Sequence, residues 1–282
     1  MESGIRNSAG AYSAPIPPSA AKGVGLVGVY EIVMTAGRDG KQRIGKALVV
    51  VAKAPSPGLV KTRLCPPLTL AEASALYECL LEDIVSKMWS CQGSEFWIAY
   101  APEGEEYFKQ NFPERALLTQ RGKDLGERLH HIFVDLFHMG YKEIIVADSD
   151  SPTVPLSSIQ RAYRQLNKED YDVVLGPSSD GGYYLIGLKC PAAGLFQRIP
   201  WSTELVMEKT LERASELGLK AGLLPVAYDI DIEEDLRRLW KDFAASRELK
   251  EQAPKTYAYL ANLLGNTATE KSTRLEVMNV RG

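Results

Sequence analysis

The sequence is poor in the residues that most often bind zinc or act as nucleophiles. Its 282 residues include only four cysteines and three histidines. The cysteines form no C-x-x-C pair, and so low a density is typical of reduced, structural thiols. All three histidines fall in one amphipathic stretch, residues 130–138, where a structural role is expected. Zinc-dependent hydrolysis and Cys/His catalysis are therefore disfavoured.

The sequence also lacks an excess of positive charge and a long apolar run. Lys and Arg number 33 against 36 Asp and Glu, which gives a formal net charge of -3. Such a chain has no broad basic field to hold a nucleic-acid backbone. No apolar run approaches the ~18 residues needed to cross a bilayer, and residues 1–30 do not have the pattern of a signal peptide. We therefore expect a cytoplasmic protein with no membrane span and no nucleic-acid partner.

Composition changes along the chain predict one folded domain with two flexible ends. Residues 1–42 are rich in Ser, Ala, Gly and Pro, with only a weak strand pattern at 29–35, and are expected to form a flexible extension. A polar tail is expected at 265–282. The remaining residues, 43–264, have the size of a single α/β domain.

Within this domain, apolar runs typical of buried strands alternate with helical patterns. Strands are expected at 47–52, 96–100, near Leu117, and at 143–147, 173–175, 183–188 and near Leu223. Helices are expected at 69–89, 124–139, after Pro155, at 202–217, and twice more at the C-terminal end. This alternation predicts an α/β fold, a three-layer sandwich with a mostly parallel central sheet.

Ligands of such sheets bind beyond the carboxyl ends of the strands, so the segments that follow strands are the informative ones. Residues 53–64 follow the first predicted strand and contain Lys53, Lys61 and Arg63. A loop with these cations and free backbone N–H groups can bind phosphates. It matches neither the P-loop nor the G-x-G-x-x-G pattern, and a solvated basic loop explains the same residues equally well.

Acidic residues follow two other strands. Asp148 and Asp150 come directly after the most hydrophobic strand, and Asp229 and Asp231 precede a helix near the C-terminus. Two neighbouring carboxylates repel each other unless a cation lies beside them. Carboxylate oxygens suit Mg²⁺ or Mn²⁺, although Asp, Ser and Pro also serve as turn and cap residues. The position at a strand end favours a metal site.

A glycine-rich segment separates the strands expected at 173–175 and 183–188. It contains Asp180, Gly181 and Gly182, followed by Tyr183. Glycines let a backbone approach a ligand closely, and tyrosines offer a stacking surface with a polar tip. A simple hairpin turn is the alternative explanation. If the segment faces a substrate, Asp180 is the candidate general base.

Taken in order, six segments resemble a bacterial family of A-type glycosyltransferase-fold proteins, the selenodomain- or arsenosugar-associated transferases (DUF2064-like). These segments are Ala52–Leu64, Asp124–Arg128, Ser149–Pro152, Gly176–Leu188, Ile199–Thr203 and Asp229–Leu236. More distantly, the pattern is similar to nucleotidyltransferases such as CMP-Kdo synthetases and phospholactate guanylyltransferases. The resemblance implies the nucleotide-diphospho-sugar transferase fold.

The resemblance also implies residue roles. Asp150 and Asp231 would bind Mg²⁺ or Mn²⁺, and Asp180, Lys61 and Arg63 would be catalytic. The nucleotide-binding residues would be Lys53, Pro55, Gly58, Lys61, Thr62, Arg63, Gly126, Arg128 and Asp148. The acceptor-binding residues would be Gly181, Gly182, Tyr183 and Trp201.

Two positions depart from the family pattern. The family usually has Gly where this chain has Asp148, and the change creates a D-x-D sequence, the metal signature of A-type glycosyltransferases. An Asp-Thr-Pro-Glu-Asp-Leu segment of related sequences is here Asp231–Leu236, with Ile and Glu in place of Thr and Pro. The carboxylate of Asp231 is retained, while the loop beside it is altered.

The function expected from these features is metal-dependent glycosyl transfer from a nucleotide-sugar to a small acceptor. The alternative is nucleotidyl transfer from a nucleoside triphosphate to a phosphorylated small molecule, with release of pyrophosphate. A third hypothesis is a noncatalytic nucleotide-binding protein. The same metal ion and cations would serve both reactions, so the residues alone do not separate them. The acceptor, the base, the sugar and the oligomeric state are not encoded in any recognisable motif.

Overall fold

The computed structural model describes residues 45–265 of the chain. The expectations for the N-terminal extension, for the strand pattern at 29–35 and for the tail beyond Gly265 lie outside the described residues. The strands are β1 (Lys46–Ala52), β2 (Glu95–Tyr100), β3 (Ala116–Thr119), β4 (Glu143–Ala147), β5 (Val173–Pro177), β6 (Tyr183–Leu188) and β7 (Ala221–Leu223). The α-helices are α1 (Leu70–Trp89), α2 (Glu105–Asn111), α3 (Leu125–His138), α4 (Leu156–Asn167), α5 (Val206–Glu216), α6 (Glu233–Ala245), α7 (Arg247–Gln252) and α8 (Pro254–Gly265).

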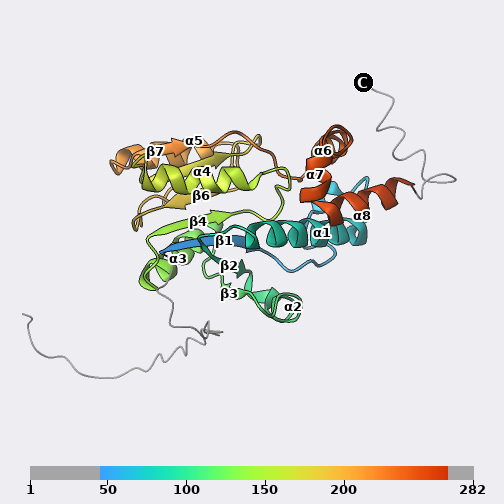
Figure 1. Cartoon of the computed structure of the whole chain (residues 1–282), viewed down its shortest axis with the longest axis horizontal. Helices are drawn as coiled ribbons and strands as arrows, with labels where there is room; N and C mark the ends of the chain where they lie inside the picture. The colour runs from blue at the N-terminus through green and yellow to red at the C-terminus, as the bar shows by residue number, and fades with distance from the viewer. Residues whose placement is uncertain (1–44, 266–282) are drawn as a thin grey trace, which may run out of the picture. The chain divides into compact units, whose positions relative to one another are not determined.

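The seven strands form one sheet in the order β3-β2-β1-β4-β6-β5-β7 (Figure 1). All neighbouring pairs are parallel except those of β6, which runs antiparallel to β4 and to β5. The carboxyl ends of β1 and β4 therefore lie side by side, next to the start of β6. This arrangement brings the segments after residues 52 and 147 together at the carboxyl ends of these strands.

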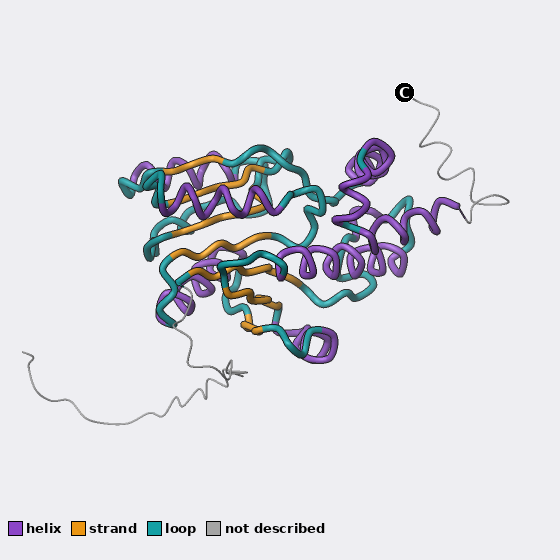
Figure 2. The backbone as a smooth tube through the Cα atoms, in the orientation of Figure 1, coloured by secondary structure: helices purple, strands orange, loops and turns teal. Residues whose placement is uncertain are grey.

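Helices cover both faces of the sheet, as Figure 2 shows by the strands between helical layers. On one face, alternate strand residues such as Leu48 and Ile145 pack against α1, α2 and α4. On the other face, the intervening residues such as Val49 and Ile144 pack against α3 and α5. Period-two alternation of buried side chains is what a sheet covered on both sides requires. The predicted three-layer α/β sandwich is confirmed.

The C-terminal helices form a third apolar cluster with the first half of α1. Leu76 and Leu80 of α1 pack there with Leu239 and Phe243 of α6 and with Leu260 of α8. Where the sequence predicted two closing helices, the chain forms three, because Ser246 ends α6 and caps α7 through a bond from Leu249 N–H to its hydroxyl. Within the described residues, no helix is long and apolar enough to cross a membrane.

Two further elements differ from the prediction. Helix α2 was not expected, since it has only seven residues and one fully buried side chain, Phe108. Helix α5 begins at Val206 rather than at Ser202, because residues 201–205 form turns and Ser202 has a φ of 64°. A positive φ at a non-glycine residue is incompatible with a regular right-handed helix.

Candidate nucleotide and acidic site

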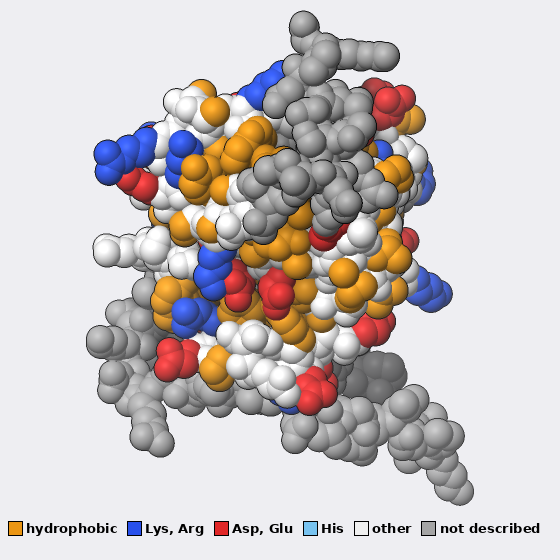
Figure 3. All heavy atoms as spheres, turned by 90° about the vertical axis from the view of Figure 1, so that its right-hand side faces the viewer, with side chains coloured by type: hydrophobic (Ala, Val, Ile, Leu, Met, Phe, Trp, Pro, Cys, Tyr) orange, Lys and Arg blue, Asp and Glu red, His pale blue; other side chains and the backbone are white. Residues whose placement is uncertain are grey.

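The site is built from three chain segments that meet at the carboxyl ends of the central strands β1 and β4. The first follows β1, the second follows β4, and the third lies between β7 and α6. A backbone bond from Ile230 N–H to the carbonyl of Asp150, with an N–O distance of 3.1 Å, joins the second and third segments. Figure 3 shows this side of the molecule, where acidic and basic side chains adjoin one another among apolar ones.

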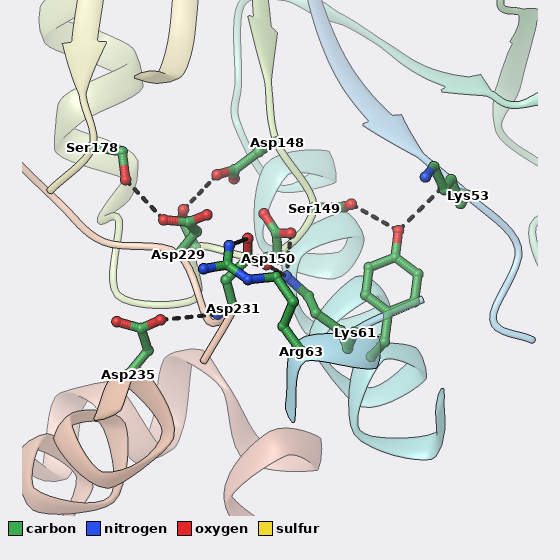
Figure 4. A network of polar contacts seen from close by, with 12 residues as sticks. Lys53, Lys61, Arg63, Asp148, Ser149, Asp150, Ser178, Asp229, Asp231 and Asp235 are labelled. Carbon is green, nitrogen blue, oxygen red and sulfur yellow. Dashed lines mark hydrogen bonds and ion pairs between the residues drawn. The ribbon is translucent and has the colours of Figure 1, made fainter. Parts of the chain in front are cut away.

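Lys61 lies at the centre of this site (Figure 4). Its Nζ donates to Asp150 Oδ2 at 2.5 Å and to Asp231 Oδ1 at 2.7 Å. Only 5% of the lysine side chain is exposed. The residue has a φ of 50° and precedes a short 3-10 helix, Thr62–Leu64, which directs the side chain inward from a tight turn. The two carboxylates predicted to share a metal ion thus share an ammonium group in this structure.

The protonation of Lys61 depends on these two carboxylates. Burial by itself would lower the pKa of the ammonium group. The charges of Asp150 and Asp231, together with their hydrogen bonds, outweigh burial and raise the pKa above its usual value. Lys61 is therefore a fixed positive charge, and the two carboxylates keep it charged.

Asp231 is also held from its other side. Asp235, in the first turn of α6, accepts hydrogen bonds from the backbone N–H groups of Asp231 and Ile232 at 3.1 and 2.9 Å (Figure 4). Arg63 Nη1 lies 3.6 Å from Asp231 Oδ2. The segment departs from the family pattern at Ile232 and Glu233, but it retains Asp235, which fixes the backbone beside Asp231 through these two bonds.

A cavity of about 340 Å³ opens beside Lys61. Its lining includes all four cations predicted to bind a nucleotide, namely Lys53, Lys61, Arg63 and Arg128, together with Thr62. Asp150 and Asp231 line it as well, and Leu59 and Leu125 supply exposed apolar surface. Pro55 and Gly58 do not line the cavity, but they lie in the loop that contributes Lys53 and Leu59 to its lining, where Gly58 has a φ of 82°. The cavity combines anion-binding groups with apolar walls, which suits a nucleotide.

Asp148 lies outside this cavity, directly after the last residue of β4. It accepts a hydrogen bond from Ser151 Oγ at 2.5 Å, and its backbone N–H donates to the carbonyl of Tyr184. Burial, followed by the charge of Asp150, raises the pKa of Asp148 well above its usual value. A role in direct nucleotide contact stays a prediction for this residue, and the cavity lining does not include it.

Asp229, a candidate from the sequence to which the family resemblance gave no role, is a second inner carboxylate. Ser178 Oγ donates to its Oδ1 at 2.8 Å (Figure 4). Burial raises the pKa of Asp229 to about 6, and the charges of Asp150 and Asp231 act in the same direction. Four carboxyl groups therefore gather at this point, and the raised pKa values of Asp148 and Asp229 favour the neutral forms of these two.

Two buried side chains of α1 hold the loops of the site. Tyr77 Oη accepts from Lys53 N–H at 3.1 Å and lies 2.9 Å from Ser149 Oγ, so it ties the ends of β1 and β4 together. Lys87 Nζ donates to the carbonyl oxygens of Pro152 and Val154, both at 2.8 Å. Helical periodicity places both residues on the buried face of α1 and gives no sign that their polar ends serve the site.

The glycine-rich segment forms a tight turn between β5 and β6. Asp180 is exposed, and its Oδ1 accepts from Gly182 N–H at 2.9 Å. Gly181 has a φ of 88°, and a Cβ there would lie 2.1 Å from the carbonyl oxygen of Glu204. The close approach that this glycine permits is thus to the chain's own segment before α5, and Met207 N–H, in the first turn of α5, donates to the Gly181 carbonyl.

The aromatic residues predicted to face an acceptor differ in their surroundings. The ring of Tyr183 packs against the core cluster below α3 and α5. Trp201 packs over Gly126, at the first turn of α3, and a Cβ on Gly126 would lie 2.4 Å from Trp201 Nε1. Because Leu125 and Arg128 of the same helix line the cavity, Gly126 and Trp201 form the layer behind its wall.

The predicted residues thus gather in two groups. Lys53, Lys61, Thr62, Arg63, Arg128, Asp150 and Asp231 surround one cavity. Asp180, Gly181, Gly182 and Tyr183 belong to the β5–β6 turn and its continuation. Sequence reasoning missed Gln120, which is buried at the end of β3, lines the cavity, and donates through Nε2 to the carbonyls of Ala52 and Ala99. A lone glutamine beyond an edge strand gives no motif by which it could be found.

Fold and site together define a transferase with the nucleotide-diphospho-sugar transferase fold. The family model described as "Uncharacterized protein conserved in bacteria (DUF2064)" matches residues 84–203. A crystal structure of a "putative nucleotide-diphospho-sugar transferase" from Desulfovibrio desulfuricans G20 is 30% identical, and the match covers 83% of this chain and 98% of that one with a TM-score of 0.72. The chain belongs to the family that includes this Desulfovibrio protein.

Other solved structures are more distant. The inositol-1-phosphate CTP transferase from T. maritima is 13% identical, with 75% of this chain and 95% of that one covered and a TM-score of 0.45. Rv0371c from Mycobacterium tuberculosis H37Rv, in complex with manganese, is 13% identical, with 70% and 98% covered and a TM-score of 0.45. No protein in the curated set matches this chain.

Proposed function

We propose that this protein transfers a glycosyl group from a nucleotide-sugar to a small acceptor. The observation that carries the proposal is the Lys61 ammonium group, buried between Asp150 and Asp231 at the wall of a cavity lined by further cations. A nucleotide diphosphate brings negative charge that such groups neutralise, and a site of this kind stabilises the charge that develops on a departing diphosphate. The 30% identical Desulfovibrio structure, which bears a nucleotide-diphospho-sugar transferase name, supports the same class.

In this proposal the residues of the cavity and those of the β5–β6 turn have different roles. Lys53, Arg63 and Arg128 bind the phosphates, with Thr62 as a further hydrogen-bond donor. Lys61 neutralises charge where the diphosphate meets the acidic pair. Asp180 accepts the proton of the acceptor, and its exposed carboxylate is fixed by Gly182 N–H. Trp201, behind α3, and the turn at Gly181 and Gly182 shape the acceptor side.

The donor set fits a divalent cation. Within residues 45–265 no group of three or more Asp, Glu, His or Cys side chains already converges as a metal site. The oxygens of Asp150 and Asp231 are nevertheless hard donors, and both already lie within 2.7 Å of one cationic atom, Nζ of Lys61. Asp150 and Asp231 would hold Mg²⁺ or Mn²⁺. When bound, the ion would act as a Lewis acid toward the diphosphate.

The direct test is a binding and turnover panel. The protein is mixed with nucleotide-sugars and nucleoside triphosphates, with Mg²⁺, with Mn²⁺ or with EDTA, and thermal unfolding and products are recorded. A ligand at ~100 times its dissociation constant adds about 2.7 kcal/mol to the free energy of unfolding. We expect a nucleotide-sugar to stabilise the protein only with divalent metal, and a nucleoside diphosphate to appear when acceptor is present.

Variants separate the competing functions. Asp150→Asn and Lys61→Gln should abolish metal-dependent stabilisation, while Asp170→Asn, an exposed carboxylate paired with Lys189, serves as the matched control. Release of pyrophosphate from a nucleoside triphosphate would show that the protein catalyses nucleotidyl transfer instead of glycosyl transfer. Unchanged ligand binding in Asp150→Ala would leave only a noncatalytic binding role. Absence of any nucleotide-induced shift would refute the nucleotide site itself.

A further inference from the structure

A second cavity, of about 440 Å³, lies at the start of α4 and shares no lining residue with the nucleotide cavity. Its walls come from the loop after β4, residues between 157 and 164 of α4, Tyr184 of β6, residues 225–228 after β7, and Arg238 of α6. These are the loops that continue from Asp150 and lead to Asp229. The cavity therefore lies at the same end of the central strands as the nucleotide cavity, but it is a separate compartment.

The charge of this cavity is of one sign. Arg161, Arg164 and Arg238 line it, and none of its lining residues is Asp or Glu. Among the described residues, none of these three guanidinium groups has a carboxylate within 4.0 Å, which sets them apart from Lys61 and Arg63. Three unneutralised arginines at one cavity are unexpected in a chain with a net charge of -3. Each keeps its donors available to an anion.

The walls beside the arginines are held in place. Arg238 stacks on the ring of Tyr228 at 3.9 Å from its centroid, and Tyr228 Oη donates to Asp242 Oδ2 at 2.5 Å. Tyr184 Oη donates to the carbonyl of Pro225 at 3.1 Å. Gly176 leaves space for the Tyr184 ring, since a Cβ there would lie 2.4 Å from it. Such fixed surroundings lower the conformational cost of binding a ligand.

The start of α4 adds backbone donors to the same cavity. Pro155 is the N-cap residue, and no side chain caps the first turn. Ser157 and Ser158, in that turn, line the cavity. An uncapped N-terminus of a twelve-residue helix offers N–H groups and the positive end of the helix dipole. Here the helix end reinforces the arginines rather than standing alone.

We propose that this cavity, the arginine pocket, binds an oxyanion group of a small molecule, a phosphate or a carboxylate. Guanidinium groups form bidentate, charge-assisted hydrogen bonds with both kinds of anion. The volume is within the range of small-molecule sites. The proposal for the arginine pocket does not depend on the proposed transfer reaction, so a separate measurement tests it.

The test uses the full-length protein in metal-free buffer without a chelator, with inorganic phosphate as the first probe and acetate as the second, at constant ionic strength. Binding is followed by isothermal titration and by the ³¹P line width of phosphate. The variants are Arg161→Gln and Arg164→Gln, both at exposed positions of α4. Lys168→Gln, an equal charge change at the far end of the same helix, and Arg63→Gln, in the nucleotide cavity, are the controls.

We expect a phosphate dissociation constant in the millimolar range for the native protein, and an increase of at least tenfold in each α4 arginine variant, with little change in the two controls. Tighter binding of phosphate than of acetate would identify a phosphate ligand, and the reverse a carboxylate. Loss of binding in Arg63→Gln with normal binding in Arg161→Gln and Arg164→Gln would overturn the proposal. So would the absence of binding by both probes.

Discussion

Lys61 and Asp150 are 89 residues apart in the sequence, and in the folded chain Nζ of one lies 2.5 Å from Oδ2 of the other. The contact exists because β1 and β4 are parallel neighbours, so the loops that follow them end side by side. Asp231 completes the arrangement from a third segment. The ammonium group thus occupies the position at which two carboxylates of a transferase site converge.

The first prediction concerns the stability that Lys61 provides. Replacing it by Met removes the ammonium group between Asp150 and Asp231 and leaves only Arg63, 3.6 Å from Asp231, as a cation beside them, so we expect a loss of about 1.5–3 kcal/mol in the free energy of unfolding. The partial exposure of both carboxylates keeps the loss below that of a fully buried pair. Urea unfolding of Lys61→Met measures it.

The coupling between these residues provides the control. In the Asp150→Asn background, Lys61→Met should cost at least 0.5 kcal/mol less than in the native chain, because the two groups interact directly. Strictly additive losses would show that the ion pair contributes nothing.

The second prediction concerns the layer behind the nucleotide cavity. In Gly126→Ala the new methyl group overlaps the indole of Trp201, so we expect about 1–3 kcal/mol of destabilisation. In the Trp201→Ala background the same change should be nearly neutral. Thermal unfolding of the four proteins measures the difference. Gly45→Ala, whose Cβ would meet only Lys142 at 3.9 Å, is the control.

The third prediction concerns the attachment of α8 to α1. Asp83 is buried, and its two oxygens accept from the backbone N–H groups of Lys255 and Thr256 at 3.1 and 2.8 Å. Asp83→Ala removes both bonds from the first turn of α8, and about 1.5–3 kcal/mol of stability should be lost.

A neighbouring carboxylate is the matched control for Asp83. Glu82 forms an ion pair with the same residue, Lys255, whose side chain is 57% exposed. Exposed ion pairs contribute little, so Glu82→Ala should cost less than about 1 kcal/mol. Hydrogen exchange of the α8 amides should accelerate in Asp83→Ala and stay unchanged in Glu82→Ala. Equal effects of the two substitutions would contradict the capping role of Asp83.

The fourth prediction is a pH dependence that comes from Lys87. Burial lowers the pKa of this lysine to about 8, and the charges of Asp148 and Asp83 only partly oppose it. In the unfolded chain its pKa is 10.5. Above pH 8 the unfolded state therefore binds more protons at this residue than the folded state, and folding becomes more favourable as pH rises. The neutral amine still has two N–H groups for the carbonyls of Pro152 and Val154.

The measurement compares the native protein with Lys87→Met. Between pH 8 and pH 9 the native protein should gain roughly 1 kcal/mol of unfolding free energy relative to the variant. The cysteines act in the opposite direction at higher pH, because burial raises the pKa of Cys79, for example, to about 11. Both proteins share that effect, so the difference between them isolates Lys87. A difference that stays flat over this range would refute the assignment.

Most of the fold could be predicted from the sequence, because it follows from local patterns. The apolar run of β4 and the 3.6-residue periodicity of α1 predict their elements nearly to the residue. Helix α2 has too few residues and too little buried surface to show a period. The break between α6 and α7 depends on one serine that accepts a backbone N–H bond, which resembles any helical serine in sequence.

The sequence by itself determined the class of chemistry: a cationic loop after the first strand, acidic pairs after two others, and a glycine turn between them. It could not determine which groups touch, because contacts between residues 61, 150 and 231 depend on strand order and on the direction of each loop. Only the tertiary structure paired Lys61 with both carboxylates, set Asp148 and Asp229 behind them, and gathered three arginines from α4 and α6 around a second cavity. The physical reason is that charges separated by many residues interact only after the sheet has brought their strands together.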